Sequence, residues 1–320
     1  MANSSFQWIG KSYDGETVTL KRFKGFSEAN STTKSESDRE FLRKGLVVDV
    51  ETTGLNRAYD QVIEIGIREF EYDKRTGEVL FVNPTPISEF QDPGIELSDE
   101  TTRLTGITTE MVKGKQINWR QVAKYLAGAN LVIAHNAAFD RPFIEKAMSY
   151  YFESESYNLN SEDKENFHSA VKNKVWACSL KQINWNSKGY PNAKLEILSI
   201  YHGFYTDAHR ALCDSDALLH LMTFHDIQTH RPYFHELLTN VRRPVIDISA
   251  NFAPFEAKDA LKSRGYYWDP AKKSWHKTIH KDSLQDEVAW MESYIYNGAF
   301  RGTVREIAPT EQFKLPPGNH

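Results

Sequence analysis

The sequence predicts an α/β layered domain built on a mixed sheet of about five strands, followed by a small α+β domain. Short apolar runs of strand length recur between residues 44 and 240, and the later runs alternate with stretches of helical periodicity. After residue 242 the composition changes, and aromatic and basic residues intermingle around two short predicted strands.

Three predicted strands open the main domain, which is expected to span residues 44–240. They cover residues 45–51, 61–72 and 79–84. Their short connections are typical of an antiparallel meander. Residues 1–43 are predicted as an N-terminal extension or linker, with a short hairpin around Asp14-Gly15.

The remainder of the main domain combines helices with two further buried strands. The predicted strands cover 131–134 and 175–178, and the predicted helices cover 101–105, 109–112, 118–128, 141–151, 194–203 and 210–224. Residues 153–173 are acidic and without periodicity, so we expect a long loop or mobile insertion there. A lid beside an active site and a neutral insertion are both open explanations of that segment.

Residues 245–305 are predicted as the small C-terminal domain and residues 306–320 as a flexible tail. A helix over 254–264 ends at Gly265, strands follow at 266–270 and 274–279, and a final helix covers 282–296. Between residues 254 and 281, seven Lys and Arg residues against three Asp and Glu residues leave 7 − 3 = +4 charges. Aromatic residues lie among these charges: Tyr266, Tyr267, Trp268 and Trp275. They form either the core of a small sheet or a platform for stacked bases.

Composition restricts the class of protein. The formal net charge of −4 over 320 residues argues against a protein that coats nucleic acid through bulk charge. Cys178 and Cys213 form no C-x-x-C pair, so neither a disulfide scaffold nor a thiolate zinc site is predicted. Without a recognisable leader or a long apolar run, we expect a reduced, cytoplasmic protein with no membrane segment.

The predicted strand over residues 45–51 carries two carboxylates within an apolar run. Asp49 and Glu51 are two residues apart, and positions i and i+2 of a strand point to the same face. Two like charges on a mostly buried element are costly unless a cation lies between them. A divalent ion such as Mg²⁺ satisfies both carboxylates. A solvent-exposed edge strand is the alternative explanation.

Two further segments place polar groups where a helix begins. Asp140 follows a predicted strand, and taken alone it would be an ordinary N-cap. His209 and Asp214 lie at the start of the helix over 210–224, where an aspartate ordinarily complements the helix dipole. Ligands gather at such positions in α/β domains, so the three segments together predict one acidic site. Asp216, about 200° around the helix from Asp214, is not assigned to it.

In their order and spacing, the three segments resemble the motifs of a known enzyme family. D-x-E-T-T-G-L from Asp49, H-N-x-x-F-D ending at Asp140 and H-x-A-x-x-D from His209 are similar to the motifs of the DnaQ-like DEDDh 3′→5′ exonucleases. These enzymes have the ribonuclease H-like fold and include the proofreading subunit of the bacterial replicative polymerase. The resemblance covers about residues 44–225.

The resemblance implies a role for each motif residue. Four carboxylates would bind two divalent ions, Mg²⁺ or Mn²⁺: Asp49, Glu51, Asp140 and Asp214. His209 would be the general base that deprotonates the nucleophilic water. Two ions about 3.5–4 Å apart stabilise the attacking and the leaving oxygen of a phosphoryl displacement. An imidazole pKa of about 6.5 suits proton transfer near neutral pH.

Substrate contacts are implied beside the metals. The terminal nucleotide would be held by the turn Thr52, Thr53, Gly54 and Leu55. Phe139 would face the same base or pack in the core, and Asn136 would orient the second motif. The expected substrate is a single strand or frayed 3′ end, DNA more than RNA, because the last nucleotide must leave its stack.

Three alternatives stay open. The same residues also serve exonucleases that trim RNA. A proofreading subunit would have a polymerase or repair complex as its partner. A nuclease-derived protein that has lost catalysis would bind nucleic acid without cutting it, but the presence of all five expected residues disfavours that alternative.

Overall fold

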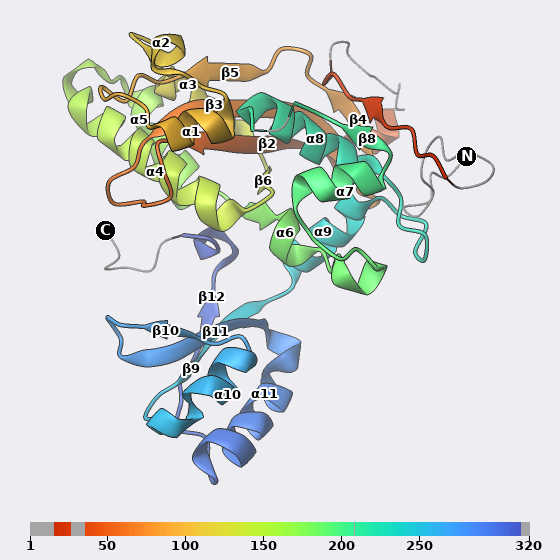
Figure 1. The fold of residues 1–320 in the computed structure, drawn as a ribbon, viewed down its shortest axis with the longest axis vertical. Coiled ribbons are helices and arrows are strands. Elements are labelled where there is room, and N and C mark those ends of the chain that lie inside the picture. The colour runs from red at the N-terminus through yellow and green to blue at the C-terminus, as the bar shows by residue number, and fades with distance from the viewer. Residues whose placement is uncertain (1–15, 27–35, 208, 315–320) are drawn as a thin grey trace. The chain divides into compact units, whose positions relative to one another are not determined.

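The computed structural model describes residues 16–26, 36–207 and 209–314. The chain divides into two compact units, one reaching Val241 and the other covering Arg242–Gln312 (Figure 1). Within those described ranges, no helix has both the length and the apolar character needed to cross a membrane. The hairpin predicted around Asp14-Gly15 lies outside the described residues.

The first unit is built on a mixed sheet with strand order β4-β3-β2-β6-β7. These strands are β2 (Leu42–Thr52), β3 (Val62–Asp73), β4 (Val79–Val82), β6 (Leu131–Ala134) and β7 (Trp176–Cys178). The first three form the expected antiparallel meander, and β6 and β7 join in parallel. A further strand that was not predicted, β5 (Ile87–Phe90), also pairs with β3. The predicted mixed α/β fold is confirmed.

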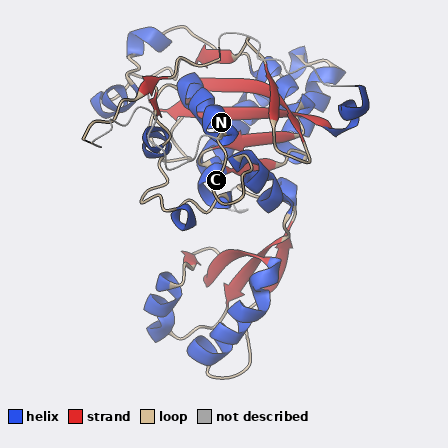
Figure 2. Ribbon diagram, turned by 90° about the vertical axis from the view of Figure 1, so that its right-hand side faces the viewer, coloured by secondary structure: helices blue, strands red, loops and turns tan. Residues whose placement is uncertain are grey.

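Side-chain alternation along β2 divides the core of this unit into two layers. Leu46, Val48 and Val50 pack in one layer, and Val47 packs in the other. The first layer is covered by α3 (Trp119–Gly128), α4 (Ala137–Ser154) and α5 (Ser161–Lys172). The second is covered by α7 (Leu195–Tyr201), α8 (Ala211–Thr223) and α9 (Tyr233–Arg242). Helices therefore lie on both faces of the sheet (Figure 2).

Smaller helices complete the unit at its loops. They are α1 (Asp99–Thr105), α2 (Thr109–Val112) and α6 (Ser179–Gln182). The helix α1 begins at the N-cap Ser98 and ends at Gly106, whose φ of 69° is the left-handed conformation that glycine adopts at helix ends. Its Thr101 hydroxyl donates to the carbonyl of Thr53 at 2.9 Å, which ties α1 to the segment after β2.

The prediction of a loop or mobile insertion over residues 153–173 is wrong. The segment contains α5, which begins with a capping box at Asn160 and packs against α3. The ring of Phe167 stacks on Phe152 with 4.4 Å between centroids. The core-facing stripe is narrow and consists of Phe167, Ala170 and Val171. Polar residues outnumber that stripe, so the periodicity is weak in the sequence, and the segment is part of a helical layer rather than a lid.

The described part of the N-terminal segment belongs to the first unit and is not a linker. β1 (Lys21–Arg22) pairs in parallel with β8 (Phe204–Tyr205). Phe23 stacks on His220 with 4.3 Å between ring centroids, and Phe26 packs on the same layer. The boundary predicted at residue 44 therefore excludes residues that contribute to this core.

The second unit contains an antiparallel sheet with strand order β10-β11-β9-β12. Its elements are β9 (Val245–Ala250), α10 (Lys258–Ser263), β10 (Tyr267–Asp269), β11 (Ser274–His280), α11 (Leu284–Met291) and β12 (Val304–Ile307). The strands β9 and β12 were not predicted from the sequence. Since β12 includes Glu306 and Ile307, the flexible tail predicted from residue 306 begins too early.

The aromatic residues of the second unit divide between core and surface. Tyr266 is buried, and Trp275 packs against the same core. Trp268 lies opposite Trp275 in register, with 5.6 Å between ring centroids, and is 48% exposed. The prediction of core packing therefore fits Tyr266 and Trp275 better than it fits Trp268.

A polar row crosses the other face of this sheet. The Ser274 hydroxyl lies 2.8 Å from His276 Nε2, and His276 Nδ1 lies 3.1 Å from both carboxylate oxygens of Asp247. The order resembles a serine-hydrolase triad, but Ser274 is only 5% exposed. The row therefore joins β11 to β9 as a buried hydrogen-bonded network.

Candidate active site

Asp49 and Glu51 lie on one face of β2, opposite Gly66 and Glu64 of β3. A Cβ atom on Gly66 would lie 2.3 Å from the backbone of Ala211, so a side chain there would push α8 away from the sheet. Glycine instead allows the first turn of α8 to contact β3 directly. This contact brings Asp214, in that first turn, next to the carboxylates of β2.

The turn before α8 folds back on the helix. The His209 backbone N–H donates to Asp214 Oδ2 at 3.0 Å, and His209 has a φ of 65°. A left-handed conformation is uncommon for a residue other than glycine and is frequently found at functional sites. Ligand atoms of Glu51, His209 and Asp214 all lie within 4.8 Å of one another, which is close enough for one metal ion to contact all three.

Asp140 reaches the site from the other layer of helices. β6 pairs with β2 only as far as Val47, which leaves the next part of β2 open on that side. The Asp140 carboxylate accepts a hydrogen bond from the backbone N–H of Val50 in that open part. Asp140 lies inside the first turn of α4, whereas Asn136 occupies the N-cap position, so the ordinary N-cap explanation for Asp140 is wrong.

The carboxylates of the site destabilise one another's charged forms. Desolvation, followed by repulsion from Asp140 and Asp214, raises the pKa of Asp49 well above its usual range. Desolvation is also the main cause that raises the pKa of Glu51 to about 8, that of Asp140 to about 7 and that of Asp214 to about 6. A cation placed among them would remove this repulsion, and oxygen ligands suit hard divalent ions. The donor set therefore fits a divalent metal.

An ion pair that the sequence did not predict lies beside this cluster. Glu64 is 1% exposed and accepts hydrogen bonds from Arg210 Nε at 3.2 Å and Nη2 at 2.9 Å. It also accepts one from the Ala211 backbone N–H at 3.1 Å. Because Arg210 follows His209 directly, the pair fixes the turn that presents His209 and Asp214. A lone glutamate inside the apolar run Val62-Ile63-Glu64-Ile65 is the signal that could have indicated a buried ion pair.

Asp216, which is not assigned to the predicted site, takes part in a separate contact with β3. It forms a buried ion pair with Arg68, in which Nε lies 2.6 Å from Oδ1 and Nη2 lies 2.8 Å from Oδ2. Planar, bidentate pairing of this kind satisfies both side chains. The helix α8 therefore carries one aspartate for the site and one that anchors the helix to β3.

The turn after Glu51 is organised by Asp60. The Thr53 hydroxyl donates to Asp60 Oδ1 at 2.8 Å, and a Cβ on Gly54 would lie 2.6 Å from Asp60 Oδ2. The Thr52 hydroxyl donates to the carbonyl of Gly54 at 2.6 Å. With the backbone held in this way, Leu55 is presented to solvent and is 83% exposed.

Pro142 connects this turn to the helix that carries Asp140. Proline has no N–H, so the carbonyl of Ala138 in α4 lacks its usual helical donor. Arg57 Nη2 donates to that carbonyl at 2.5 Å. From the next turn of α4, Lys146 Nζ donates to the carbonyls of Arg57, Ala58 and Asp60 at 2.9–3.2 Å. These bonds fix the turn beside Glu51 relative to Asp140.

The remaining residues of the second motif differ in their surroundings. Phe139 packs toward the core with its ring 4.9 Å from that of Phe143, whereas Asn136 is exposed. His135 is bonded at both ring nitrogens, to the Ser179 hydroxyl at 2.8 Å and to the carbonyl of Ala193 at 2.7 Å. Desolvation lowers the pKa of His135 to about 4, so its imidazole is a neutral structural group at pH 7.

Acidic side chains from β2, α4 and α8 converge at one place beside the mixed sheet. This combination of fold and site is that of a nuclease. The chain belongs to the Exonuclease family, whose sequence model (RNase_T) matches residues 46–222, more than half of the chain. The resemblance to DnaQ-like exonucleases is thereby confirmed. Enzymes of this family act on nucleic acids and use divalent metals.

Two relatives show the extent of the sequence similarity. The DNA polymerase III PolC-type of Listeria innocua is 40% identical over 105 residues, which are 32% of this chain and 7% of the polymerase. The Clostridium perfringens counterpart is 36% identical over 111 residues, which are 34% of this chain and 7% of that protein. The chain therefore spans only a small part of the length of these relatives.

Solved structures of E. coli Exonuclease I are also similar. The complex with a dA16 oligonucleotide has 17% sequence identity and a TM-score of 0.45, over 74% of this chain and 63% of that one. The zinc ion bound form of the complex with single-stranded DNA has 14% identity and a TM-score of 0.47, over 87% and 66% of the two chains.

Proposed function

We propose that the protein is a metal-dependent 3′→5′ exonuclease that releases nucleoside 5′-monophosphates from single-stranded or frayed ends, with DNA favoured over RNA. The observation that carries the proposal is the convergence of four carboxylates and one histidine beside the end of β2: Asp49, Glu51, Asp140, Asp214 and His209. The PolC-type relatives are named DNA polymerases, which supports DNA as the substrate and a polymerase or repair complex as a partner.

The charge of the site supports two divalent ions. The four motif carboxylates and Glu64 carry −5 when ionised, and Arg210 contributes +1, which leaves −5 + 1 = −4. Two divalent cations, Mg²⁺ or Mn²⁺, would balance that charge. Such ions supply stabilisation of negative charge on phosphate oxygens and a lowered pKa for water. Asp49, Glu51, Asp140 and Asp214 would hold them.

His209 is suited to accept the proton of the attacking water. Its side chain is exposed, while its backbone is held by Asp214, so the imidazole is open to solvent on a fixed turn. The Asp214 and Glu51 carboxylates lie beside the ring. Positioned proton transfer of this kind contributes about 10²–10⁴-fold to a rate.

The turn after Glu51 is suited to hold the end of a strand. Leu55 offers an exposed apolar side chain on a backbone fixed by Asp60 and Arg57, so it can pack against a terminal base without first being ordered. Thr52, Thr53 and Gly54 would approach the terminal sugar and phosphate through their backbone. A base must leave its neighbours to reach this turn, which favours single strands and frayed ends.

The test is degradation of matched 5′-labelled single-stranded DNA and RNA with Mg²⁺, with Mn²⁺ and with EDTA. We expect a ladder that shortens from the 3′ end, depends on metal and is lost in Asp49→Asn. Glu153→Gln, which neutralises an exposed carboxylate of α4, is the matched control and should retain activity. Faster cleavage of RNA would reverse the substrate preference, and no cleavage of either strand would indicate a binding protein instead.

A further inference from the structure

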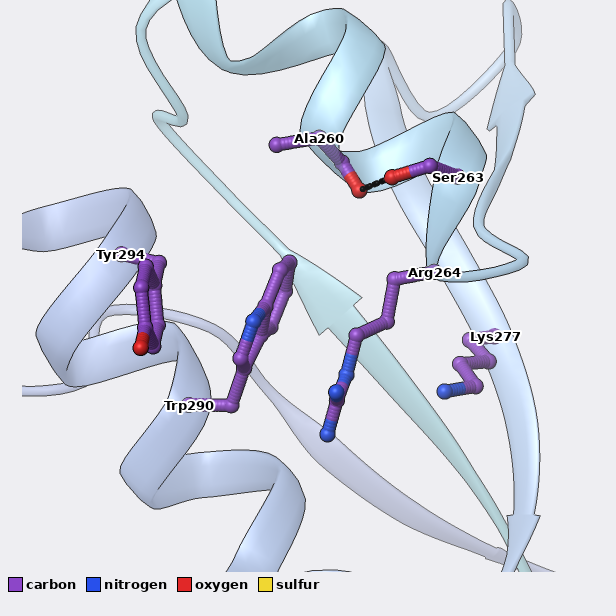
Figure 3. Close-up of a pocket in the computed structure, with 6 residues that line it drawn as sticks. All are labelled: Ala260, Ser263, Arg264, Lys277, Trp290 and Tyr294. Carbon is purple, nitrogen blue, oxygen red and sulfur yellow. Dashed lines mark hydrogen bonds between the residues drawn. The ribbon is translucent and has the colours of Figure 1, made fainter.

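The second unit contains a cleft of about 520 Å³ whose residues are absent from the nuclease motifs. Its walls come from α10, β11, α11 and the π-helical turn Glu292–Tyr296. The lining residues are Ala260, Ser263, Arg264, Lys277, Trp290 and Tyr294. Figure 3 shows the ring of Trp290 between that of Tyr294 and the guanidinium of Arg264, with Lys277 beyond the guanidinium.

The planar groups of this cleft form a row. Trp290 and Tyr294 are four residues apart, and their rings lie 24° from parallel with 6.0 Å between centroids. The guanidinium carbon of Arg264 lies 4.6 Å from the centroid of Trp290. Tyr294 is 73% exposed and Trp290 is half-buried, so the row presents aromatic surface to solvent. Its inner side is supported by Tyr266, stacked 6.3 Å from Trp290.

The cations of the cleft retain binding capacity. Arg264 and Lys277 share one buried counter-ion, Glu287, at 3.3–3.4 Å for Arg264 and 3.0 Å for Lys277. Two cations on one carboxylate leave a local charge of +1. A guanidinium has five N–H donors and an ammonium three, so donors remain after both side chains have bound Glu287. Those donors suit the oxygens of a phosphate group.

We propose that this cleft binds a single strand of nucleic acid, with bases against Tyr294 and Trp290 and a phosphate on Arg264 and Lys277. The choice of this occupant rests on the proposed function, because a nuclease acts on such a strand. Aromatic rings beside basic side chains bind single strands in a sequence-tolerant way, since every base has a face that can stack. The +1 charge and the aromatic surface complement the two parts of a nucleotide.

This assignment moves the predicted stacking platform within the second unit. The sequence offered a platform as one of two explanations for four aromatic residues, Tyr266, Tyr267, Trp268 and Trp275. Of these, Tyr266 and Trp275 pack in the core, and Trp268 contacts Trp275. Trp290 lies in α11 and Tyr294 in the π-helical turn that follows it, outside the basic stretch over residues 254–281. The packing of α11 beside the basic C-terminal end of α10 depends on the tertiary fold. No sequence motif therefore indicates the cleft.

A strand held at this cleft would be tethered to the nuclease by the polypeptide. Covalent linkage of two binding modules makes the second binding event intramolecular and raises its effective concentration. We therefore expect the cleft to increase the affinity for long strands and the number of nucleotides removed per encounter. Oligonucleotides too short to occupy both units gain nothing from it.

The test is the affinity of the full chain for a fluorescent oligodeoxythymidine of about 20 nucleotides, measured in EDTA so that no cleavage occurs. Loss of a stacked aromatic weakens single-strand binding by a factor of about 5–150, and we expect this for Trp290→Ala. Tyr294→Ala and Arg264→Gln should weaken binding in the same direction. Because Tyr294 is largely exposed, its variant keeps the test valid if Trp290→Ala fails to fold.

Matched controls come from the same unit. Phe252→Ala removes an aromatic side chain that is 85% exposed and outside the cleft lining. Arg305→Gln removes an arginine on the opposite face of the sheet, because Arg305 is in register with Asp247, whereas Lys277 is in register with Ile248. Both controls should bind within about twofold of the unmodified chain. Folded Trp290, Tyr294 and Arg264 variants that also bind within twofold would overturn the proposal and leave the cleft to another class of ligand, such as a peptide.

A small substrate separates this proposal from the proposed function. The p-nitrophenyl ester of thymidine 5′-monophosphate is too short to reach a second site. Its hydrolysis with Mn²⁺ therefore requires only the acidic site. If the cleft variants retain ester hydrolysis and lose strand affinity, both proposals are supported. If the unmodified chain binds strands through the cleft but leaves the ester intact, the exonuclease proposal fails alone. If the ester is hydrolysed and strand affinity is independent of the cleft, the cleft proposal fails alone.

Discussion

The two units arrange charge in opposite ways. At the acidic site of the first unit, like charges are brought together, and the side chains that act most strongly on Asp49 are other carboxylates. At the cleft of the second unit, Arg264 and Lys277 are already paired with Glu287. The carboxylates of the first unit need a cation to balance their charge. The cations of the second unit are already balanced by Glu287 except for one excess positive charge, and only that charge is left for a ligand. We infer that the acidic site is organised for a metal and the cleft for a weaker, sequence-tolerant ligand.

The largest expected effect is that of neutralising a carboxylate of the acidic site. Asp140→Asn should lower kcat by about 10³-fold or more, because it removes a ligand at the reacting centre. The same change should stabilise the metal-free protein at pH 8 by a few kcal/mol, because a group with a pKa of about 7 is costly to ionise in the fold. Ladder assays and chemical denaturation in EDTA measure the two effects. Activity and stability lost together would mean that Asp140 is structural.

The next effect concerns the histidine on the strained turn. His209→Asn should lower kcat by about 10²–10⁴-fold while the fold is retained, because asparagine tolerates the left-handed conformation but transfers no proton. His209→Ala loses the imidazole and also places alanine at a positive φ. We expect equal activity of the two variants and a lower melting temperature for alanine. A His209→Asn enzyme with near-normal kcat would exclude this histidine as the base.

A smaller effect is expected at the ion pair that orients the turn. Glu64→Gln should weaken metal binding by about 10–100-fold, because groups behind the ligands commonly contribute that much. Isothermal titration with Mn²⁺ and the metal dependence of kcat measure it. Saturating metal should then restore most of the rate, which distinguishes a positioning residue from a ligand. Asp216→Asn is the control, since Asp216 is bound to Arg68 in a separate ion pair and metal affinity should be unchanged.

The sequence predicts the convergence of the four carboxylates because their positions follow local rules. Strand alternation places Asp49 and Glu51 on one face, and motif spacing places Asp140 and Asp214 at two helix starts. The place of Glu64 in the site does not follow from local rules, because it depends on which residue of β3 lies opposite Glu51. The core strand β9 was missed because Asp247 and Ser249 interrupt its apolar pattern. Both are buried in contacts with residues distant in the sequence, which a local reading does not reveal.

The smallest effect is a pH dependence that should appear in the first unit and not in the second. In the folded, metal-free protein, desolvation raises the pKa values of Glu51, Asp140 and Asp214 to about 8, 7 and 6. Above about pH 6.5 the buried histidines of the first unit, His135, His202 and His220, are neutral in both states. From there to about pH 8 the carboxylates make the folded state bind more protons than the unfolded state, and the free energy of unfolding falls as pH rises. Glu287 is opposite: desolvation opposes its charge, but hydrogen bonds from Lys277 and Arg264 outweigh that and lower its pKa. The contribution of Glu287 to the free energy of unfolding is present above the pKa of an unfolded glutamate. It is lost as pH falls through the lower pKa of Glu287 in the folded state.

Thermal unfolding in EDTA at about pH 6.5 and pH 8 tests this difference, because histidines contribute little to the pH dependence over that range. We expect the transition of the first unit to move to lower temperature at pH 8 and that of the second unit to stay in place. Saturating Mn²⁺ at pH 8 should reverse the shift, and Asp140→Asn should reduce it. A first unit that is equally stable at both pH values without metal would mean that its carboxylates do not repel one another as the geometry implies, and the contrast between the two units would then disappear.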